Sequence, residues 1–376
     1  MGRPVRGGGT PVERLMTIGE FARASRLSAK ALRRYDELGL LTPARVDAYS
    51  GYRYYAGAQV ERARLVAWLR RIGMPLAEVR DVCVLHGTDP GAAARTVRAY
   101  WARVEAETAA RRDLAASLAD RLGGPTDMTT TMTTTYARPY GLLSAALSER
   151  GRVRETNQDR VHAGPRLLAV ADGYGAAGDR AASAALAEIE GVRAPDRVGD
   201  LLNALEDAVR RADTAVGAAA PGSGTTLTAG VWTGDRFALA HVGDGRAYLL
   251  RDGELTRLTR DHTVVQERVE AGELDSAEAA AHPDRALLLR ALDGAGSGPV
   301  ADLGLYEGRP GDRWLLCTDG LSAVVPEAEI RGVLAAGSGP ADTVRALVDL
   351  ALVDAEGRGG PDNVSCVVAD VVPDRA

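Results

Sequence analysis

Five aspartates in the second half of the chain stand where apolar runs begin or end: Asp159, Asp172, Asp244, Asp319 and Asp362. An aspartate at a strand end is often only a turn residue, and Asp252-Gly253 is expected to be a hairpin turn of that kind. Carboxylates at several strand ends can instead converge on one edge of a sheet. Bare acids crowded together repel one another, so such a cluster predicts hard divalent cations with oxygen ligands.

Other kinds of hydrolytic or phosphate site are disfavoured by the residues that the sequence lacks. Lysine occurs only at position 30, whereas haloacid-dehalogenase-type phosphatases, receiver domains and P-loop NTPases need a lysine near the site. No Gly-x-Ser-x-Gly motif is present, and Gly222-Ser223-Gly224 resembles it only superficially. Scattered histidines and unpaired cysteines serve zinc poorly. Of the kinds of site considered, the one that remains is a two-metal site that activates water.

The N-terminal region predicts two short helices with basic residues on the second. Thr17 and Glu20 form a capping-box signature, Ser28 can cap the next helix, and Gly39 can end it. Two such helices fit a helix-turn-helix. The second carries Lys30, Arg33 and Arg34, and a Tyr-Arg run follows at 52–55. A basic helix face is often merely solvated, but the order of capped helix, basic helix, hairpin and two packing helices favours DNA binding.

Charge is spread unevenly along the 376 residues. Residues 1–127 contain 21 Lys and Arg against 14 Asp and Glu, a net of +7, and residues 128–376 contain 25 against 37, a net of −12. A basic block beside an acidic one suggests a polyanion partner for the first. The three single cysteines predict buried free thiols, and no apolar run approaches the ~18 residues of a membrane helix. A cytoplasmic protein with no membrane partner is expected, associated with the nucleoid when bound to DNA.

The first domain, residues 15–85, resembles the MerR family in the motifs at 16–22, 32–41, 43–45 and 51–55. The resemblance implies an all-α winged helix-turn-helix whose second helix reads the major groove of double-stranded DNA and whose wing grips phosphates. Its DNA-binding residues would be Lys30, Arg33, Arg34, Tyr35, Tyr52 and Arg53. Arg34 replaces a tyrosine that is usual in the family, so base preference does not transfer.

Residues 90–122 predict one long helix that ends at Gly123-Gly124-Pro125, and 123–136 form a Thr-rich linker. A heptad seam runs along the helix through Val97, Trp101, Val104, Thr108, Arg111, Ala115, Leu118 and Leu122. A surface helix packed on its own domain is the alternative. Because MerR-like proteins dimerise through an antiparallel coiled coil here, a homodimer is expected. Cys83 alone cannot form the cysteine site with which some members sense metals.

Residues 137–373 resemble bacterial phosphatases of the PP2C type along an ordered series of motifs. These are Gly151-x-x-Arg154-x-x-Asn157-Gln158-Asp159, Val170-Ala171-Asp172-Gly173-x-Gly175, Gly224-Thr225-Thr226, His241-Val242-Gly243-Asp244-x-Arg246, Leu258-Thr259-x-Asp261-His262, Leu316-Cys317-Thr318-Asp319-Gly320-Leu321-Ser322 and Gly359-Gly360-x-Asp362-Asn363. The resemblance implies an α+β, four-layer αββα sandwich with metals between the ends of two antiparallel sheets.

The same resemblance implies the ligands of two Mn²⁺ or Mg²⁺ ions. Asp172 would bridge both ions, and the Gly173 carbonyl would bind the second. Asp319 and Asp362 would hold the first. Asp159 would bind or orient water on the second ion.

A third, weaker ion and a phosphate clamp complete the implied site. Asp244, with Asp319, would bind the third ion, and Arg154 would clamp the phosphoryl oxygens with its planar fork. Two cations ~3.5–4 Å apart lower the pKa of a bridging water and stabilise in-line attack on phosphorus. This predicts hydrolysis of phosphoserine and phosphothreonine in proteins.

Few positions depart from the family pattern, and none removes an implied metal ligand. Gly245 replaces a common Ser, Tyr174 stands where other members carry Met or His, and Ala176-Ala177 replace Gly and a polar residue. Residues 263–285 match a mobile flap over the family's site, and His262 and His282 are interpreted as structural. An active enzyme is expected.

The sequence thus predicts a DNA-binding transcriptional regulator that carries a phosphatase. One alternative makes the PP2C-like domain mainly a sensor with little catalysis. Another makes the MerR-like part a dimerisation or docking module without DNA binding, which the presence of Arg33, Tyr35 and Arg53 disfavours.

Overall fold

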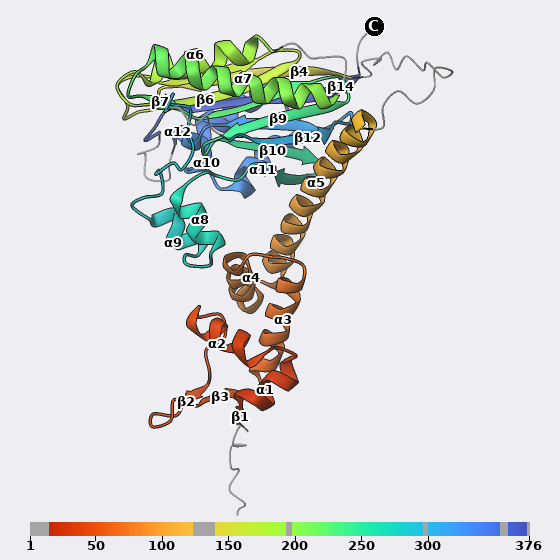
Figure 1. Cartoon of the computed structure of the whole chain (residues 1–376), viewed down its shortest axis with the longest axis vertical. Coiled ribbons are helices and arrows are strands. Elements are labelled where there is room, and N and C mark those ends of the chain that lie inside the picture. The colour runs from red at the N-terminus through yellow and green to blue at the C-terminus, as the bar shows by residue number, and fades with distance from the viewer. Residues whose placement is uncertain (1–14, 123–139, 193–197, 296–299, 354–359, 374–376) are drawn as a thin grey trace, which may run out of the picture. The chain divides into compact units, whose positions relative to one another are not determined.

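The computed structural model describes residues 15–122, 140–192, 198–295, 300–353 and 360–373 (Figure 1). The chain divides into two compact units, one of Met1–Val97 with Glu267–His282 and the other of Arg98–Gln266 with Pro283–Ala376. The expected linker at 123–136 lies outside the described residues. Within them, no helix combines the length and apolar character needed to cross a membrane.

The first unit contains the expected helix-turn-helix. Its elements are β1 (Leu15–Thr17), α1 (Ile18–Ser25), α2 (Ala29–Glu37), β2 (Arg45–Val46), β3 (Arg53–Ala56), α3 (Gln59–Arg71) and α4 (Leu76–Thr88). The capping box of Thr17 and Glu20 is formed, and the Ser28 side chain accepts a hydrogen bond from the Ala31 N–H. Gly39 takes φ +66°, the left-handed conformation that ends a helix. The three short strands form an antiparallel sheet in the order β1-β3-β2.

Apolar packing fixes the position of α2 within this unit. Phe21 of α1 and Leu32 of α2 are fully buried, and the Phe21 ring stacks on Tyr55 of β3 with centroids 4.5 Å apart. Stacked aromatic pairs at such distances add to the stabilisation from burial. The ring stack therefore joins α1 to β3, the strand that carries Arg53, and α2 contributes Leu32 to the buried core of the unit.

The segment Glu267–His282 belongs to this first unit, although its sequence lies between two phosphatase motifs. It includes most of α8 (Val264–Glu270) and all of α9 (Ser276–Ala281). Nη1 of Arg80, on α4, lies 3.7 Å from carboxylate oxygens of both Asp275 and Glu278. Nη2 of Arg80 donates to the carbonyl of Leu38 at the C-terminal cap of α2.

The long helix α5 spans Pro90–Leu122, the range that the sequence predicts. Its 33 residues give a length of about 50 Å at 1.5 Å per residue. Along the predicted seam, Val97 and Val104 are partly buried, whereas Trp101 and Thr108 are exposed. Dimerisation through this helix stays a prediction.

The second unit contains two antiparallel sheets. The first has the order β11-β10-β13-β14-β4 and comprises β11 (Glu254–Arg257), β10 (Arg246–Arg251), β13 (Arg313–Cys317), β14 (Val364–Pro373) and β4 (Tyr140–Glu149). The second has the order β12-β9-β8-β6-β5 and comprises β12 (Asp302–Glu307), β9 (Arg236–Val242), β8 (Leu227–Trp232), β6 (Leu167–Tyr174) and β5 (Asp159–Ala163), with β7 (Gly224–Thr225) paired to β6.

Helices cover the outer faces of both sheets, which gives the expected αββα layers (Figure 1). α6 (Gly178–Glu190) and α7 (Val198–Ala219) pack on the second sheet, and α10 (Asp319–Ser322), α11 (Glu327–Ala335) and α12 (Pro340–Leu352) pack on the first. A further apolar core lies between the two sheets, and in it the Phe237 ring stacks on Trp314 with ring centroids 4.4 Å apart.

Two smaller predictions are confirmed in detail. Asp252 and Gly253 both take positive φ, +51° and +82°, between β10 and β11, as a two-residue hairpin turn requires. The cysteines Cys83, Cys317 and Cys366 are all free and buried.

Candidate metal centre

The five aspartates lie at strand ends, and both sheets contribute. Asp159 begins β5 and is paired in register with Asp172 near the end of β6. Asp244 lies in the turn between β9 and β10. Asp319 begins α10 directly after β13, and Asp362 precedes β14. The fold therefore brings together carboxylates as far apart in the sequence as Asp159 and Asp362.

Burial and mutual repulsion raise the pKa values of Asp159, Asp172, Asp244 and Asp319. The pKa of Asp172 is raised well above its usual range by burial and then by the charges of Asp159, Asp319 and Asp244. Burial raises the pKa of Asp159 to about 6 and, with repulsion from Asp319, that of Asp244 to about 8. The Asp319 pKa is raised by burial and by Asp362. A charge-neutralising partner would relieve this repulsion.

Two buried oxygens of the set, Oδ1 of Asp159 and Oδ1 of Asp319, have no hydrogen-bond partner among the described residues. Buried polar atoms are almost always paired, so such atoms point to a missing partner. Among the same residues, no group of three or more carboxylates, imidazoles or thiols is arranged so that it could hold a metal ion. The fit to a cation therefore rests on the unpaired oxygens and on the all-oxygen donor set, which suits Mg²⁺ or Mn²⁺.

Neighbouring backbone holds Asp172 and Gly173 in place. The Asp172 carbonyl accepts hydrogen bonds from the Thr226 N–H at 2.8 Å and from the Thr225 hydroxyl at 2.9 Å. A Cβ on Gly173 would meet the Gly178 carbonyl oxygen at 2.0 Å. Only glycine fits at this close approach of two backbone segments, which explains the Asp-Gly order.

Asn363, for which no role was predicted from the sequence, holds a loop beside the candidate site through its side-chain hydrogen bonds. Its Oδ1 accepts from the Gln158 N–H, and its Nδ2 donates to the carbonyls of Arg150 and Thr156, each at 2.9 Å. The buried side-chain amide thus fixes the loop 150–158 beside Asp362. The Asp-Asn pair at the start of an apolar run was the available signal.

Arg154 lies on that loop and reaches the carboxylate set. Its Nη2 is 2.7 Å from Oδ2 of Asp362, and 56% of its side chain is exposed. A guanidinium has five N–H donors in a planar fork, so most of them remain available to an incoming anion.

The predicted DNA-binding residues lie on α2 and the wing of the first unit. Lys30, Arg33 and Arg34 are exposed, and Arg34 lies 3.6 Å from Glu37. Tyr35, by contrast, is only 9% exposed, because it packs into the core. Its contact with DNA would be limited to the exposed edge of the ring.

The wing is tied to the second helix. Nε of Arg53 lies 2.6 Å from Oδ2 of Asp36 on α2, whereas Tyr52 is 52% exposed. One N–H of Arg53 therefore orients the wing through Asp36, and its other N–H groups can donate to a phosphate.

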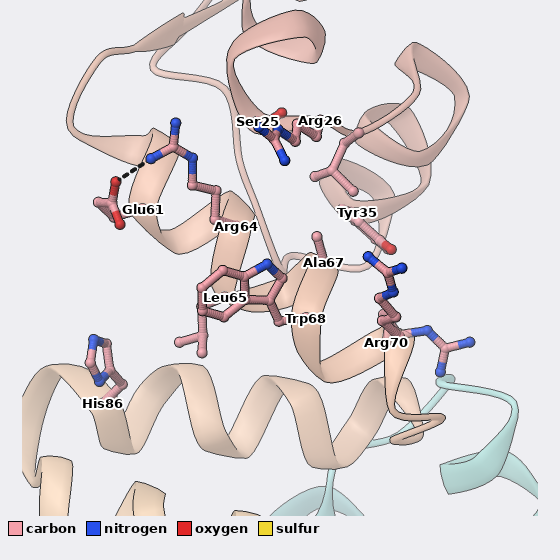
Figure 2. Close-up of a pocket in the computed structure, with 12 residues that line it drawn as sticks. Ser25, Arg26, Tyr35, Glu61, Arg64, Leu65, Ala67, Trp68, Arg70 and His86 are labelled. Atoms are coloured by element: carbon pink, nitrogen blue, oxygen red, sulfur yellow. Dashed lines mark hydrogen bonds and ion pairs between the residues drawn. The ribbon is translucent and has the colours of Figure 1, made fainter.

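A groove of about 730 Å³ lies elsewhere on the first unit (Figure 2). It is lined by the α1–α2 turn, one face of α3 and His86 of α4. Trp68 is 71% exposed there, and Arg64 pairs with Glu61 at 2.9 Å. Of the predicted site residues only Tyr35 borders this groove, and none of the five aspartates does.

Comparisons with known families cover both halves of the chain. Residues 149–351, more than half of the chain, match the protein phosphatase 2C family, and residues 16–84 match the MerR HTH family of regulatory proteins.

Individual relatives match the phosphatase half. The serine/threonine protein phosphatase PstP of Mycobacterium tuberculosis is 46% identical over 236 residues, which are 61% of this chain and 45% of that protein. The chain thus spans less than half of that relative's length. The serine/threonine phosphatase stp of Listeria monocytogenes is 36% identical over 149 residues, 40% of this chain and 57% of that protein.

Solved structures of phosphatases also match this part of the chain. The crystal structure of the Mycobacterium tuberculosis phosphatase PstP/Ppp superposes with a TM-score of 0.57 at 44% identity, covering 62% of this chain and 99% of that one. The catalytic domain of PstP in complex with two manganese ions gives a TM-score of 0.56 at 45% identity, with the same coverage. The chain therefore belongs to the protein phosphatase 2C family and carries, ahead of that domain, a MerR-type helix-turn-helix.

Proposed function

We propose that the chain is a metal-dependent protein serine/threonine phosphatase that its helix-turn-helix domain brings to DNA. The observation that carries the catalytic half is the set of strand-end carboxylates with raised pKa values and two unpaired buried oxygens. The observation that supports the DNA half is the exposed basic face of α2 beside a wing that Arg53 holds in place.

The carboxylates would hold two Mn²⁺ or Mg²⁺ ions. Asp172 would bridge them, the Gly173 carbonyl would bind the second ion, and Asp319 and Asp362 would hold the first. Asp159 would orient water on the second. When bound, such ions supply an activated water for in-line attack on phosphorus, without a phosphoenzyme.

Arg154 and Asp244 complete the proposed site. Arg154 would bind the phosphoryl oxygens of phosphoserine or phosphothreonine, because its partly exposed guanidinium already lies beside Asp362. Asp244, with Asp319, would bind a third and weaker ion.

The DNA-binding half would act as a homodimer joined along α5. Lys30, Arg33 and Arg34 would enter the major groove, and Tyr52 and Arg53 of the wing would contact phosphates. DNA binding would place the phosphatase on the nucleoid, near substrates that regulate the bound genes.

Phosphate release tests the catalytic half. The purified full chain should release phosphate from a phosphothreonine peptide with Mn²⁺ or Mg²⁺, and EDTA should abolish the release because it removes the ions. Restored turnover on adding back Mn²⁺ is the control for damage by the chelator. A chain that binds Mn²⁺ but releases no phosphate would support the alternative, a sensor with little catalysis.

A further inference from the structure

His262 makes two reciprocal hydrogen bonds to Gly243, the residue before Asp244. The His262 N–H donates to the Gly243 carbonyl at 2.7 Å, and the Gly243 N–H donates to Nδ1 of the His262 ring at 3.1 Å. The His262 side chain is only 2% exposed, so neither group can exchange its partner for water at low cost.

The second ring nitrogen of His262 faces a carboxylate. Nδ1 accepts from the Gly243 N–H, and Nε2 lies 3.1 Å from Oδ2 of Asp302. This hydrogen bond lowers the pKa of Asp302 to about 2. Nη1 of Arg290 lies 2.9 Å from the other oxygen of Asp302 and 3.3 Å from Nε2 of His262, so the three side chains meet at one place. Contacts at both ring nitrogens thereby fix the orientation of the ring.

Asp261 holds the other end of the same turn. It accepts a bidentate pair from Arg246, at 3.2 Å to Nε and 2.8 Å to Nη2. The turn from Gly243 to Arg246 is therefore anchored at both ends by two consecutive residues, and Asp244 lies between the anchors. Gly243 has φ +108°, and a Cβ there would meet Thr226 at 2.6 Å, so the turn has little room to relax.

We infer that His262 is a positioning residue that presents Asp244 to its cation. The inference rests on the proposed function, because Asp244 is assigned there to the third, weaker ion. The ring acts through the acceptor Nδ1 and the Gly243 N–H, not by contact with substrate. Groups that orient a metal ligand typically change metal affinity 10- to 100-fold when they are altered.

Two conservative variants separate the roles of the ring nitrogens. His262→Asn puts an acceptor oxygen near the place of Nδ1 and loses the contact with Asp302. His262→Gln puts its amide near the place of Nε2 and leaves the Gly243 N–H without an acceptor. His162→Gln, on a partly exposed ring paired with Glu190, is the matched control.

Calorimetric titration of the full chain with Mn²⁺ provides the readout, with phosphate release as a second. We expect His262→Gln to weaken the third ion roughly 10-fold or more while the two tight ions stay unchanged, and His262→Asn to bind all three nearly as the wild type does. Asp244→Asn should remove the same third ion. Equal weakening in both His262 variants, or in neither, would overturn the inference alone. A wild type that binds no Mn²⁺ would overturn the proposed function as well.

Discussion

At the scale of single residues, the second unit buries groups that water would otherwise stabilise. Asp172 and Asp244 are held where both burial and neighbouring carboxylates oppose ionisation. His241 is a different case, because it is buried as a neutral ring. Its Nδ1 lies 2.9 Å from the Thr228 hydroxyl and its Nε2 3.0 Å from the Arg260 carbonyl. The carboxyls of Asp172 and Asp244 are suited to a bound cation, whereas burial favours the neutral form of the His241 ring.

The burial of His241 contributes a loss of stability in acid, opposite in sign to the contribution of the carboxyls whose pKa values are raised. Burial, with the neighbouring His262, lowers the pKa of His241 from 6.5 to about 4. Between those values the unfolded chain binds a proton that the folded chain does not, so stability falls as pH falls from 6.5 to 4. The loss should reach about 3 kcal/mol at pH 4, at 1.36 kcal/mol per pKa unit.

Urea unfolding at several pH values in this window measures that loss. His241→Gln should remove this contribution from the dependence of the unfolding free energy on pH, because the variant has no ring to protonate, while His162→Gln should leave the dependence as in the wild type. The same slope in all three proteins would show that His241 is not responsible.

At the scale of elements, local signals in the sequence predicted much of the structure. The Gly-Gly-Pro at 123–125 predicted that α5 ends at Leu122, and α2 ends just before Gly39 as expected. The hydrogen bonds of Asn363 and the pairing of Arg53 with Asp36 were not predicted, because they join residues that only the tertiary fold brings together.

The wing and α2 should differ in what they contribute to DNA binding. Arg53→Ala should weaken binding to all sequences alike and reduce the dependence on salt, because a phosphate contact releases counterions. Arg33→Ala should also blur the sequence preference if it reaches a base edge. Arg95→Ala, on α5, is the matched control.

Binding of the full chain to selected and scrambled duplexes over a range of salt concentrations measures both effects. Chains that bind no DNA even at low salt would leave the helix-turn-helix as a docking module.

At the scale of the whole molecule, the grouping of Glu267–His282 with the first unit raises the question of coupling. A segment encoded among the phosphatase motifs contacts Arg80, which also binds the carbonyl at the end of α2. This grouping could not be predicted from the sequence, because the order of the motifs assigns the whole segment to the phosphatase domain as a flap. The alternative to coupling is a tether that merely co-localises two independent activities.

Coupling predicts that a bound phosphopeptide changes the affinity for DNA. The change should lie toward the lower end of the usual 5- to 150-fold range, because partly exposed ion pairs such as those of Arg80 are weak. Operator affinity would be measured with and without phosphopeptide on Asp319→Asn protein, which prevents turnover. Arg80→Ala should abolish the difference, and so should lengthening the linker by about 20 Gly/Ser residues if the tether transmits it. Equal operator affinities with and without the phosphopeptide, in every variant, would leave co-localisation of two independent activities as the explanation.

The central claim is that the strand-end carboxylates form the catalytic metal site, and the activity of Asp172→Asn tests it most directly. The variant keeps the size and shape of the side chain but removes the charge that would bridge two ions. Asp252→Asn is the matched control, because it makes the same change in an exposed hairpin turn whose positive φ asparagine also tolerates. With Mn²⁺ and a phosphothreonine peptide, we predict that Asp172→Asn loses nearly all phosphate release while it remains folded, and that Asp252→Asn retains the wild-type rate. Phosphate release that survives in Asp172→Asn would contradict the two-metal assignment.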